Sequence, residues 1–470
     1  MVKRIIYITF LIGCVSVVWS QNDSTVTLTR SQYEGILQRL NALENQAEKS
    51  QKRMAKQNQM KENDTTITTS HASKGRLQLG GYGEITMHRF FYSNEFTRYA
   101  YPEQYKNVPS RGQFDLPHVV FTVAYDFGKG WKMSAEVEFE HGGTGTTIEI
   151  EEEEFGEYEQ EVEKGGEIAL EQFWLEKSFA KWANLRIGHI IVPIGLTNQF
   201  HLPTEFFSVL RPEEENTILP LTWHETGVSF WGRAAAWRYE LQFLAGLDAE
   251  RFSNSGWIKD GAVSPYEFSL GNSYALAARV DNYSVKGLRM AVSGYYGHSA
   301  ANSLKSDRYK DITGRVMIGS FDACYKDYGV LTDISVVYGH LTDSKAISIA
   351  NKNMPKGSPS PRTNVASDAL SFAFNVGYDI FHTIKKLHQR EMKFYLFAHF
   401  GYVNSMFATA EGISKEARFD RHIVSGGINF YPIKNLVIKA EFASRMFFNL
   451  PYNTENTFSI GAAYSGMFTN

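Results

Sequence analysis

Residues 186–232 read RIGHIIVPIGLTNQFHLPTEFFSVLRPEEENTILPLTWHETGVSFWG. The two ends of this stretch belong to segments rich in β-branched and apolar residues, 184–191 and 226–233, which predict two strands. The residues between them, 192–225, combine prolines with aromatic and aliphatic side chains. A solvent-exposed loop of this length is usually polar, so we expect this one to pack inside a structure formed by the rest of the chain.

The composition favours strands over helices. Aromatic residues make up 14% of the 470 residues, with 25 Tyr, 33 Phe and 38 Gly. The mean hydropathy of −0.30 fits a soluble protein and equally a transmembrane β-barrel, whose lumen-facing polar residues offset its lipid-facing ones. The net charge of −3 gives no indication of a nucleic-acid partner.

Residues 1–20 have the pattern of a secretory signal peptide, with Lys3 and Arg4 before an apolar run that ends at Ser20. Residues 11–14, LIGC, also fit a lipoprotein signal that would place a lipid on Cys14. We favour cleavage after Ser20 because the run stays apolar beyond Cys14. Cleavage would leave Cys324 without a partner in the chain, so neither an internal disulfide nor a cysteine-based metal site is expected.

The next segment, residues 21–60, predicts a short periplasmic helix. Ser31 and Glu34 form a capping box, and apolar residues follow at steps of three and four as far as Met54. The helix could trimerise as a short coiled coil or stand alone at a surface, and it could contact peptidoglycan or another periplasmic component. A polar linker follows at 61–75.

From residue 76 to residue 470 the apolar residues recur at every second position, which predicts an all-β fold. In 131–141, for example, Trp131 and Phe139 share an apolar face, while Glu136 and Glu138 lie on the opposite face. About sixteen strands, an even number, suit a closed antiparallel transmembrane β-barrel. The predicted strands are 77–90, 118–127, 131–141, 168–176, 184–191, 226–233, 237–247, 274–282, 288–298, 315–325, 330–340, 369–380, 392–402, 422–430, 436–445 and 457–467.

The connections between these strands alternate in length. Mostly short turns follow the even-numbered strands, and mostly long loops follow the odd-numbered ones. Outer-membrane barrels segregate their connections in this way, with short periplasmic turns and long external loops, and a soluble sandwich has no reason to do so. The chain is therefore predicted to place both ends in the periplasm, with 192–225 as its third long loop.

Six runs of residues together resemble a known family. They are GGYGEI at 80–85, VEFEH at 137–141, IALEQFWLE at 168–176, RIGHIIVPIGLTNQFHLPTEF at 186–206, RPEEENTILPLTW at 211–223 and HETGVSFWG at 224–232. They resemble outer-membrane porins of the phosphate-selective porin O and P type, especially members from Bacteroidetes-like bacteria. The resemblance implies a sixteen-stranded trimeric pore whose third loop folds into the lumen and lines the channel.

We expect ten residues to line the constriction and the lumen. The resemblance also implies ladders of Arg and Lys in the lumen, but loop 192–225 holds one arginine against five glutamates. The predicted lumen is therefore mixed in charge, and a mixed lumen would not focus one anion strongly. The ten residues are Arg186, Pro193, Asn198, His201, Arg211, Glu213, Glu136, Glu138, Arg279 and Arg289.

Three histidines flank the third loop: His189, His201 and His224. With Glu213 or Glu225 they could bind a metal or transfer protons, but their spacing matches no metal or acid–base motif. We expect His201 and Arg211 instead to hydrogen-bond the loop to the barrel wall.

The acidic run over 149–163 could collect divalent cations or bridge lipopolysaccharide. It has no EF-hand-like spacing, so we expect a solvated, unstructured external loop.

The sequence thus predicts a bacterial outer-membrane porin for passive diffusion of small hydrophilic solutes, with no catalytic residues, cofactor or metal. Outer-membrane lipid and lipopolysaccharide would surround it, and it would form a homotrimer. Two alternatives stay open. One is an outer-membrane hydrolase, although no G-x-S-x-G elbow is present, and the other is a plugged barrel acting as a surface adhesin or envelope tether.

Overall fold

The computed structural model describes residues 77–143, 147–153, 157–163, 167–220, 222–262, 270–303, 305–355, 357–388 and 390–469. The predicted signal peptide, periplasmic helix and linker lie outside these ranges. In the described part of the chain, no helix is long and apolar enough to span a membrane.

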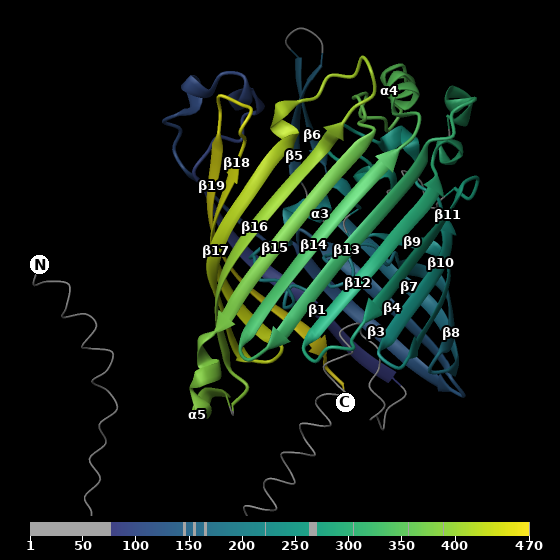
Figure 1. Cartoon of the computed structure of the whole chain (residues 1–470). Helices are drawn as coiled ribbons and strands as arrows, with labels where there is room; N and C mark the ends of the chain where they lie inside the picture. Colours follow the sequence, from purple (N-terminus) through teal and green to yellow (C-terminus); the bar gives the residue numbers. More distant parts are fainter. Residues whose placement is uncertain are drawn as a thin grey trace, which may run out of the picture. The chain divides into compact units, whose positions relative to one another are not determined.

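Sixteen antiparallel strands close into a barrel (Figure 1), because β19 pairs back onto β1 from Gly80↔Met467 to Phe90↔Thr457. The predicted number of strands is confirmed. Three predicted strands, 77–90, 274–282 and 288–298, have the observed ends. The barrel strands are β1 (Leu77–Phe90), β3 (His118–Gly128), β4 (Trp131–Glu140), β7 (Glu167–Ala180), β8 (Ala183–Ile191), β9 (His224–Ala234), β10 (Trp237–Ala245), β11 (Tyr274–Asn282), β12 (Leu288–His298), β13 (Arg315–Asp327), β14 (Val330–Leu341), β15 (Asp368–Asp379), β16 (Lys393–Ala408), β17 (Asp420–Ile433), β18 (Leu436–Met446) and β19 (Thr454–Met467).

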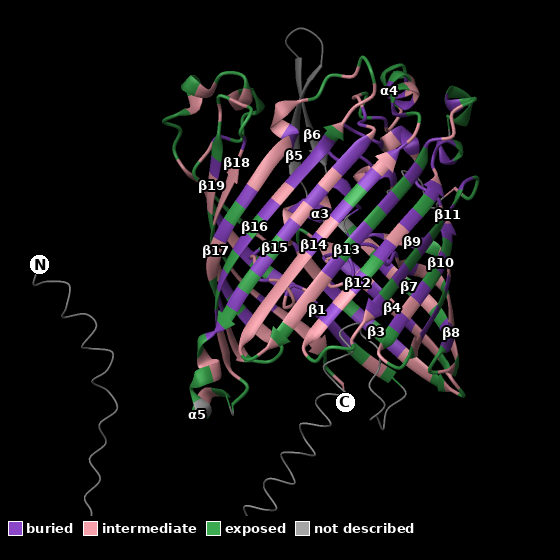
Figure 2. Cartoon of the chain, viewed as in Figure 1, coloured by how far each residue is buried: buried purple, intermediate pink, exposed green. Residues whose placement is uncertain are grey.

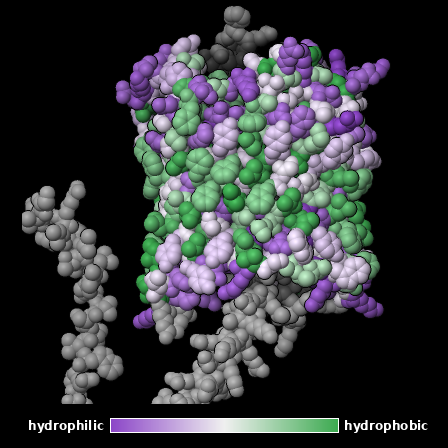
Figure 3. All heavy atoms as spheres, viewed as in Figure 1, coloured by the Kyte–Doolittle hydropathy of each residue, from purple (hydrophilic) through white to green (hydrophobic). Residues whose placement is uncertain are grey.

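Side chains alternate between the two faces of the sheet as the sequence predicts. In β4, Trp131 is exposed on the outside, whereas Glu136 and Glu138 are buried inside. The same alternation of buried and exposed residues runs along the other strands (Figure 2), and apolar side chains gather in a belt on the outer surface (Figure 3). A closed sheet with such a belt can cross a bilayer, since every strand finds hydrogen-bond partners on both sides.

Short strands that the sequence did not predict occur in two of the long loops. β2 (Arg111–Asp115) adds to the upper end of β1, opposite Thr86–Phe90. In the acidic run, β5 (Thr147–Glu153) and β6 (Glu157–Glu163) form an antiparallel hairpin, so the prediction of an unstructured loop was wrong for the backbone. The physical reason lies in the sequence, because β-branched and aromatic residues alternate with the glutamates at the period of a strand.

In the described part of the chain, the helices lie in the connections between strands. Figure 1 shows α4 at the end of the barrel with the long loops and α5 at the opposite end. The helices are α3 (Glu213–Ile218), α4 (Ser344–Lys352) and α5 (Lys385–His388). The 3-10 turns are η1 (Phe96–Tyr99), η2 (Pro102–Tyr105), η3 (Ala249–Arg251), η4 (Lys259–Ala262), η5 (Ala300–Asn302), η6 (Ser306–Tyr309), η7 (Ile380–Thr383) and η8 (Ala417–Phe419).

An apolar core lies inside the barrel near its long-loop end. Five connections, 192–223, 246–273, 299–314, 342–367 and 409–419, supply side chains that pack on the inner faces of strands between β8 and β17. The ring of Trp257 occupies the space in front of Gly339, where a Cβ atom would lie 2.0 Å from the indole. The loop members of the core are Val192, Ile194, Ile218, Leu219, Trp223, Leu247, Ala249, Phe252, Trp257, Ile258, Ala300, Tyr309, Ile347, Met354, Val365, Ala366 and Phe419.

Candidate functional site: the loop-lined barrel interior

The third loop runs from residue 192 to residue 223, two residues shorter than predicted because β9 begins at His224. The Val192 N–H donates to the Trp223 carbonyl over 2.8 Å and joins the two ends of the loop. We call this junction of residues 192 and 223 the neck of the loop. Asn198 reinforces the neck, because its side-chain amide donates to the Val192 carbonyl (2.7 Å) and its oxygen accepts from the Trp223 N–H. Pro193 is buried beside the neck, so these two predicted residues shape the base of the loop.

Beyond its neck the loop reaches the inner faces of strands on the other side of the lumen. Lys439 donates to the Phe206 and Ser208 carbonyls over 2.9 and 2.8 Å. The Glu441 carboxylate accepts from the Val209 N–H over 2.8 Å. At these positions wall side chains satisfy backbone groups of the loop, which lowers the cost of placing an irregular segment inside the barrel.

Two glycines of the inner wall make room for side chains of the loop. At Gly377 an added Cβ atom would lie 2.3 Å from the Phe207 ring, and at Gly401 it would lie 1.7 Å from a carboxylate oxygen of Glu214. The Phe207 ring stacks on Phe397, with ring centroids 5.2 Å apart and planes 7° apart. Because Gly377 and Gly401 have no side chain, Phe207 and Glu214 can pack directly against the wall, and these contacts fix the position of the loop.

The three glutamates that begin α3 each have a different partner. Glu213 forms ion pairs with Arg421 and Arg445. Glu214 accepts from His399 Nε2 over 2.9 Å. Glu215 turns back into the loop and accepts from the backbone N–H groups of residues 196 and 197 over 3.0 and 2.8 Å, and it also accepts from the Ser335 hydroxyl. The first turn of α3 is therefore fixed to both the wall and the loop.

We predict that the Glu213 anchor loses strength only in acid. Although burial opposes ionisation, Arg421 and Arg445 outweigh it and lower the pKa of Glu213 from 4.5 to about 2. The native state then binds fewer protons than the unfolded state, so the anchor stabilises fully above pH 4.5 and is lost as the pH falls toward 2. In urea unfolding, the difference in free energy between the wild type and Glu213→Gln should be constant above pH 4.5 and shrink below it. A difference that instead shrinks between pH 5 and 8 would contradict this assignment.

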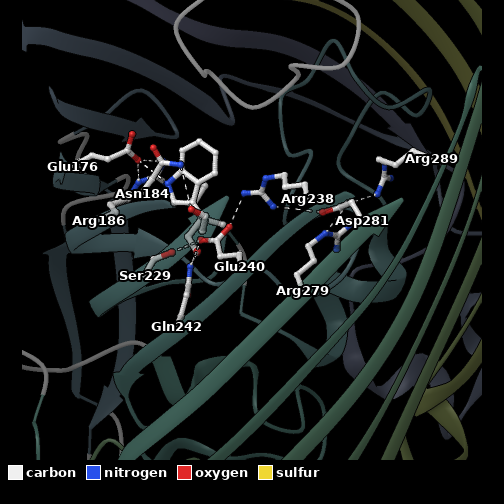
Figure 4. Close-up of polar contacts among 12 residues, drawn as sticks. Glu176, Asn184, Arg186, Ser229, Arg238, Glu240, Gln242, Arg279, Asp281 and Arg289 are labelled. Atoms are coloured by element: carbon white, nitrogen blue, oxygen red, sulfur yellow. Dashed lines mark hydrogen bonds and ion pairs between the residues drawn. The ribbon is translucent and has the colours of Figure 1, made fainter. Parts of the chain in front are cut away.

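On the other side of the lumen, the strands β10 to β13 carry a network of three arginines and three carboxylates. Figure 4 shows its members Arg238, Arg279, Arg289, Glu240 and Asp281. Arg279 is fully buried and contacts Asp281 at 3.1 Å and Asp322 at 2.8 Å, and its third nitrogen donates to the Gly195 carbonyl of the loop over 3.0 Å. The other ion pairs of the network join Arg289 to Asp281 and Asp322, and Arg238 to Glu240 and Asp281. Its positive and negative charges balance.

The side chain of Arg186, in β8, contacts residues of the neighbouring strand β7. It pairs with Glu176 at 2.8 Å and lies over the Trp174 ring, with its guanidinium carbon 4.3 Å from the ring centroid. Trp231 donates to the same carboxylate over 2.9 Å. The pairing turns the guanidinium toward the wall, and within the described residues Arg186 forms no hydrogen bond or ion pair with the third loop.

The inner faces of β1, β3, β4 and β7 form what we call the acidic wall: Glu84, His118, Glu136, Glu138 and Glu171. The loop reaches it through His201, whose Nε2 lies 3.5 Å from Glu171 Oε1. Tyr82 also donates to Glu171, over 3.0 Å. His201 approaches the wall as expected, but among the described residues its ring hydrogen-bonds to the Asn198 carbonyl of the loop and not to Glu171. Arg211 differs from expectation, because it donates to Thr222 and to the His201 carbonyl within the loop rather than to the wall.

The interior therefore brings the ten predicted residues together in separate groups. His201 lies with Glu136, Glu138 and the rest of the acidic wall. Arg279 and Arg289 lie with the balanced network, and Glu213 lies with a third group on β17 and β18. His189 and His224 pair with each other, and neither joins His201. Sequence reasoning missed Arg421, His399, Gly377 and Gly401, although glycines at inward positions of long strands were a signal in the sequence.

The comparisons with known proteins give distant similarities. No family model matches the chain. It is 23% identical over 372 residues to an uncharacterized protein of Aquifex aeolicus (strain VF5), with 78% of this chain and 76% of that protein covered.

Similar solved structures include the outer membrane channel DcaP of Acinetobacter baumannii, with a TM-score of 0.47 and 10% identity over 85% of this chain and 100% of that chain. An anion-selective porin from Comamonas acidovorans has a TM-score of 0.45 and 8% identity, with 83% and 99% covered. The outer membrane protein OmpT of Vibrio cholerae in its trimer form has a TM-score of 0.45 and 12% identity, with 83% and 100% covered. At these values the assignment of a barrel rests on the closed strand order of this chain itself.

Proposed function

We propose that this protein is an outer-membrane channel through which small hydrophilic solutes and ions diffuse passively, and that it has no enzymatic activity. The observation that carries the proposal is the third loop, which lies inside a closed barrel and is bound to the opposite wall through polar and charged groups. A loop held in this way narrows the lumen and leaves charged side chains beside the narrowing.

The charges of the interior suggest how the channel selects among solutes. The network on β10 to β13 is balanced and adds little net field, whereas the acidic wall has an excess of carboxylates. A permeating ion exchanges part of its hydration for these fixed charges, so we propose a preference for cations over anions, phosphate included.

The assembly is part of the same proposal. Outer-membrane lipid and lipopolysaccharide would contact the apolar belt, the N-terminal segment would lie in the periplasm, and three copies would associate through their barrel walls. Native mass spectrometry in mild detergent tests the trimer, and deletion of residues 31–60 tests whether that segment contributes to it.

Single-channel recording of purified, folded protein in planar bilayers tests the channel. We expect stepwise currents and a reversal potential in a KCl gradient that favours K⁺. The double variant Glu138→Gln/Glu171→Gln should shift the reversal potential toward chloride, because it removes carboxylates from the lumen. The control Glu411→Gln changes an exposed residue of a long loop and should leave the potential unchanged.

Two results would count against the proposal. A silent bilayer from correctly folded protein would reject the channel and favour a plugged barrel that acts as a tether. Block of the chloride current by low concentrations of phosphate would reject the proposed cation preference and support a phosphate-selective pore.

A further inference from the structure

The acidic wall holds more buried carboxyl groups than close cationic partners. Glu84, Glu136, Glu138 and Glu171 are each at most 6% exposed. In the described part of the chain, Glu84 and Glu138 pair with His118 and Glu171 pairs with His201. Glu136 accepts hydrogen bonds from Thr122 and Gln172. The network on β10 to β13 provides the contrast, since three arginines there face three carboxylates. Buried carboxylates persist in proteins when they are paired, protonated or bound to a metal.

Two other cations act on this wall from a greater distance. Arg211 and Lys439 influence Glu84 electrostatically. Neither forms an ion pair with a glutamate of the acidic wall among the residues that the structure describes. Lys439 is committed to two loop carbonyls and Arg211 to Thr222 and the His201 carbonyl. His118 and His201 therefore remain the only ion-pair partners of the glutamates of the acidic wall among the described residues.

The geometry of His118 leaves one ring nitrogen available. Its Nδ1 lies 2.7 Å from Glu138 Oε1, and because a carboxylate accepts, Nδ1 carries the proton and donates. In the neutral ring, Nε2 then presents a lone pair toward Glu84, whose Oε1 lies 3.9 Å away. This gap is too wide for a hydrogen bond. A zinc-like ion binds nitrogen and carboxylate oxygen at about 2.0–2.2 Å, so it could bridge the two atoms.

A second observation points independently to a ligand. The other oxygen of Glu84, Oε2, is buried and has no hydrogen-bond partner among the described residues. A buried carboxylate oxygen without a partner is destabilising, and each such case calls for a physical explanation. A cation between Glu84 and His118 would supply the missing partner.

A second histidine with two nearby carboxyl groups lies beside Glu136, the next inward-facing residue of β4 after Glu138. His201 Nδ1 lies 3.3 Å from the Asn198 carbonyl, which can only accept, so Nε2 again carries the lone pair. Its Nε2 faces Glu171, and ligand atoms of His201, Glu171 and Glu136 lie within 4.8 Å of one another.

We propose that the acidic wall binds a divalent transition-metal cation, with His118 Nε2 and Glu84 as ligands and Glu138 as the positioning residue that orients the ring. A histidine that ligates a metal commonly donates its other N–H to a carboxylate, which is the arrangement of Glu138. The spacing of the sequence did not predict the site because its two ligands come from different strands, Glu84 from β1 and His118 from β3.

The ligand set determines which cation is expected. An imidazole nitrogen with carboxylate oxygens suits Zn²⁺, Co²⁺, Ni²⁺ or Cu²⁺, whereas Mg²⁺ and Ca²⁺ prefer oxygen ligands alone. Competition by Mg²⁺ therefore separates this site from exposed acidic segments, which would bind the two kinds of cation without preference. Binding needs no conduction, so the inference can fail or succeed independently of the proposed channel.

Titration of the full chain in detergent with Co²⁺ and Zn²⁺ tests the site. We expect a saturable visible absorption band of Co²⁺ that Zn²⁺ removes and that excess Mg²⁺ does not. His118→Gln and Glu84→Gln should each weaken the Co²⁺ affinity by about 10- to 100-fold or more. Retained heat-modifiable migration on SDS gels would show that each variant is folded.

His340→Gln is the matched control. His340 Nδ1 contacts Asp368 Oδ1 at 2.8 Å, which reproduces the histidine–carboxylate pair, but no third ligand group accompanies it among the described residues. This variant should keep the Co²⁺ band and affinity. A folded wild type without the band, an unchanged affinity in both His118→Gln and Glu84→Gln, or equal competition by Mg²⁺ would each overturn the proposal.

Discussion

Replacement of Arg279 by methionine is expected to lower the free energy of unfolding by about 3–5 kcal/mol, the usual cost of removing one partner from a buried ion pair. Arg279 is fully buried, and its carboxylate partners Asp281 and Asp322 are at most 2% exposed. Without Arg279, Asp322 keeps Arg289 as its ion-pair partner, and Asp281 keeps Arg289 and Arg238 at 3.3 and 3.5 Å. The variant also loses the hydrogen bond to the Gly195 carbonyl, so the third loop should loosen near its neck.

Urea unfolding of the barrel, followed by tryptophan fluorescence, measures this effect. Arg315→Met is the control, because Arg315 lies at the exposed start of β13 and forms no ion pair with the residues that the structure describes. It should change stability by less than about 0.5 kcal/mol, as surface substitutions usually do. If both variants lose the same stability, the cost would come from the substitution itself rather than from the buried network.

The barrel could be predicted from the sequence because its information is local. In β4 and β10 the alternation of apolar and polar residues is enough to place one face toward lipid and the other inward. The third loop was also predictable, since prolines and aliphatic residues over 192–225 do not suit solvent. The hairpin β5–β6 shows the limit of this approach: a high density of glutamates concealed a strand period that was present.

The contacts inside the barrel could not be predicted, because they join residues that are distant in the sequence. Glu213 meets Arg421 and Arg445 only after the barrel has closed. For Arg211 a contact was predicted that the structure does not have. We expected the lone arginine of the acidic loop to bind the wall, but it donates to groups of the loop itself. Cross-lumen pairing depends on the register of several strands, and no single segment carries that information.

Replacement of Gly401 by alanine is expected to displace the third loop and raise the single-channel conductance. The new Cβ atom would lie 1.7 Å from Glu214 Oε1 and 2.4 Å from its carboxyl carbon, so the carboxylate must move away from the wall. That movement breaks the 2.9 Å contact between Glu214 and His399, one of the bonds that hold α3 in place. Crowding in a packed interior costs about 1–3 kcal/mol, which the barrel can tolerate while its loop shifts.

Gly319→Ala is the matched control for this experiment, because Gly319 also lies within a barrel strand, β13, and an added Cβ atom there would meet nothing within 4 Å. We expect its conductance to equal that of the wild type. A second variant separates crowding from loss of the hydrogen bond. His399→Gln removes the imidazole and adds no atom at Gly401, so it should raise the current noise more than the mean conductance. An unchanged conductance in Gly401→Ala would mean that α3 does not limit the flow of ions, and the narrowest part of the lumen would then lie along the acidic wall.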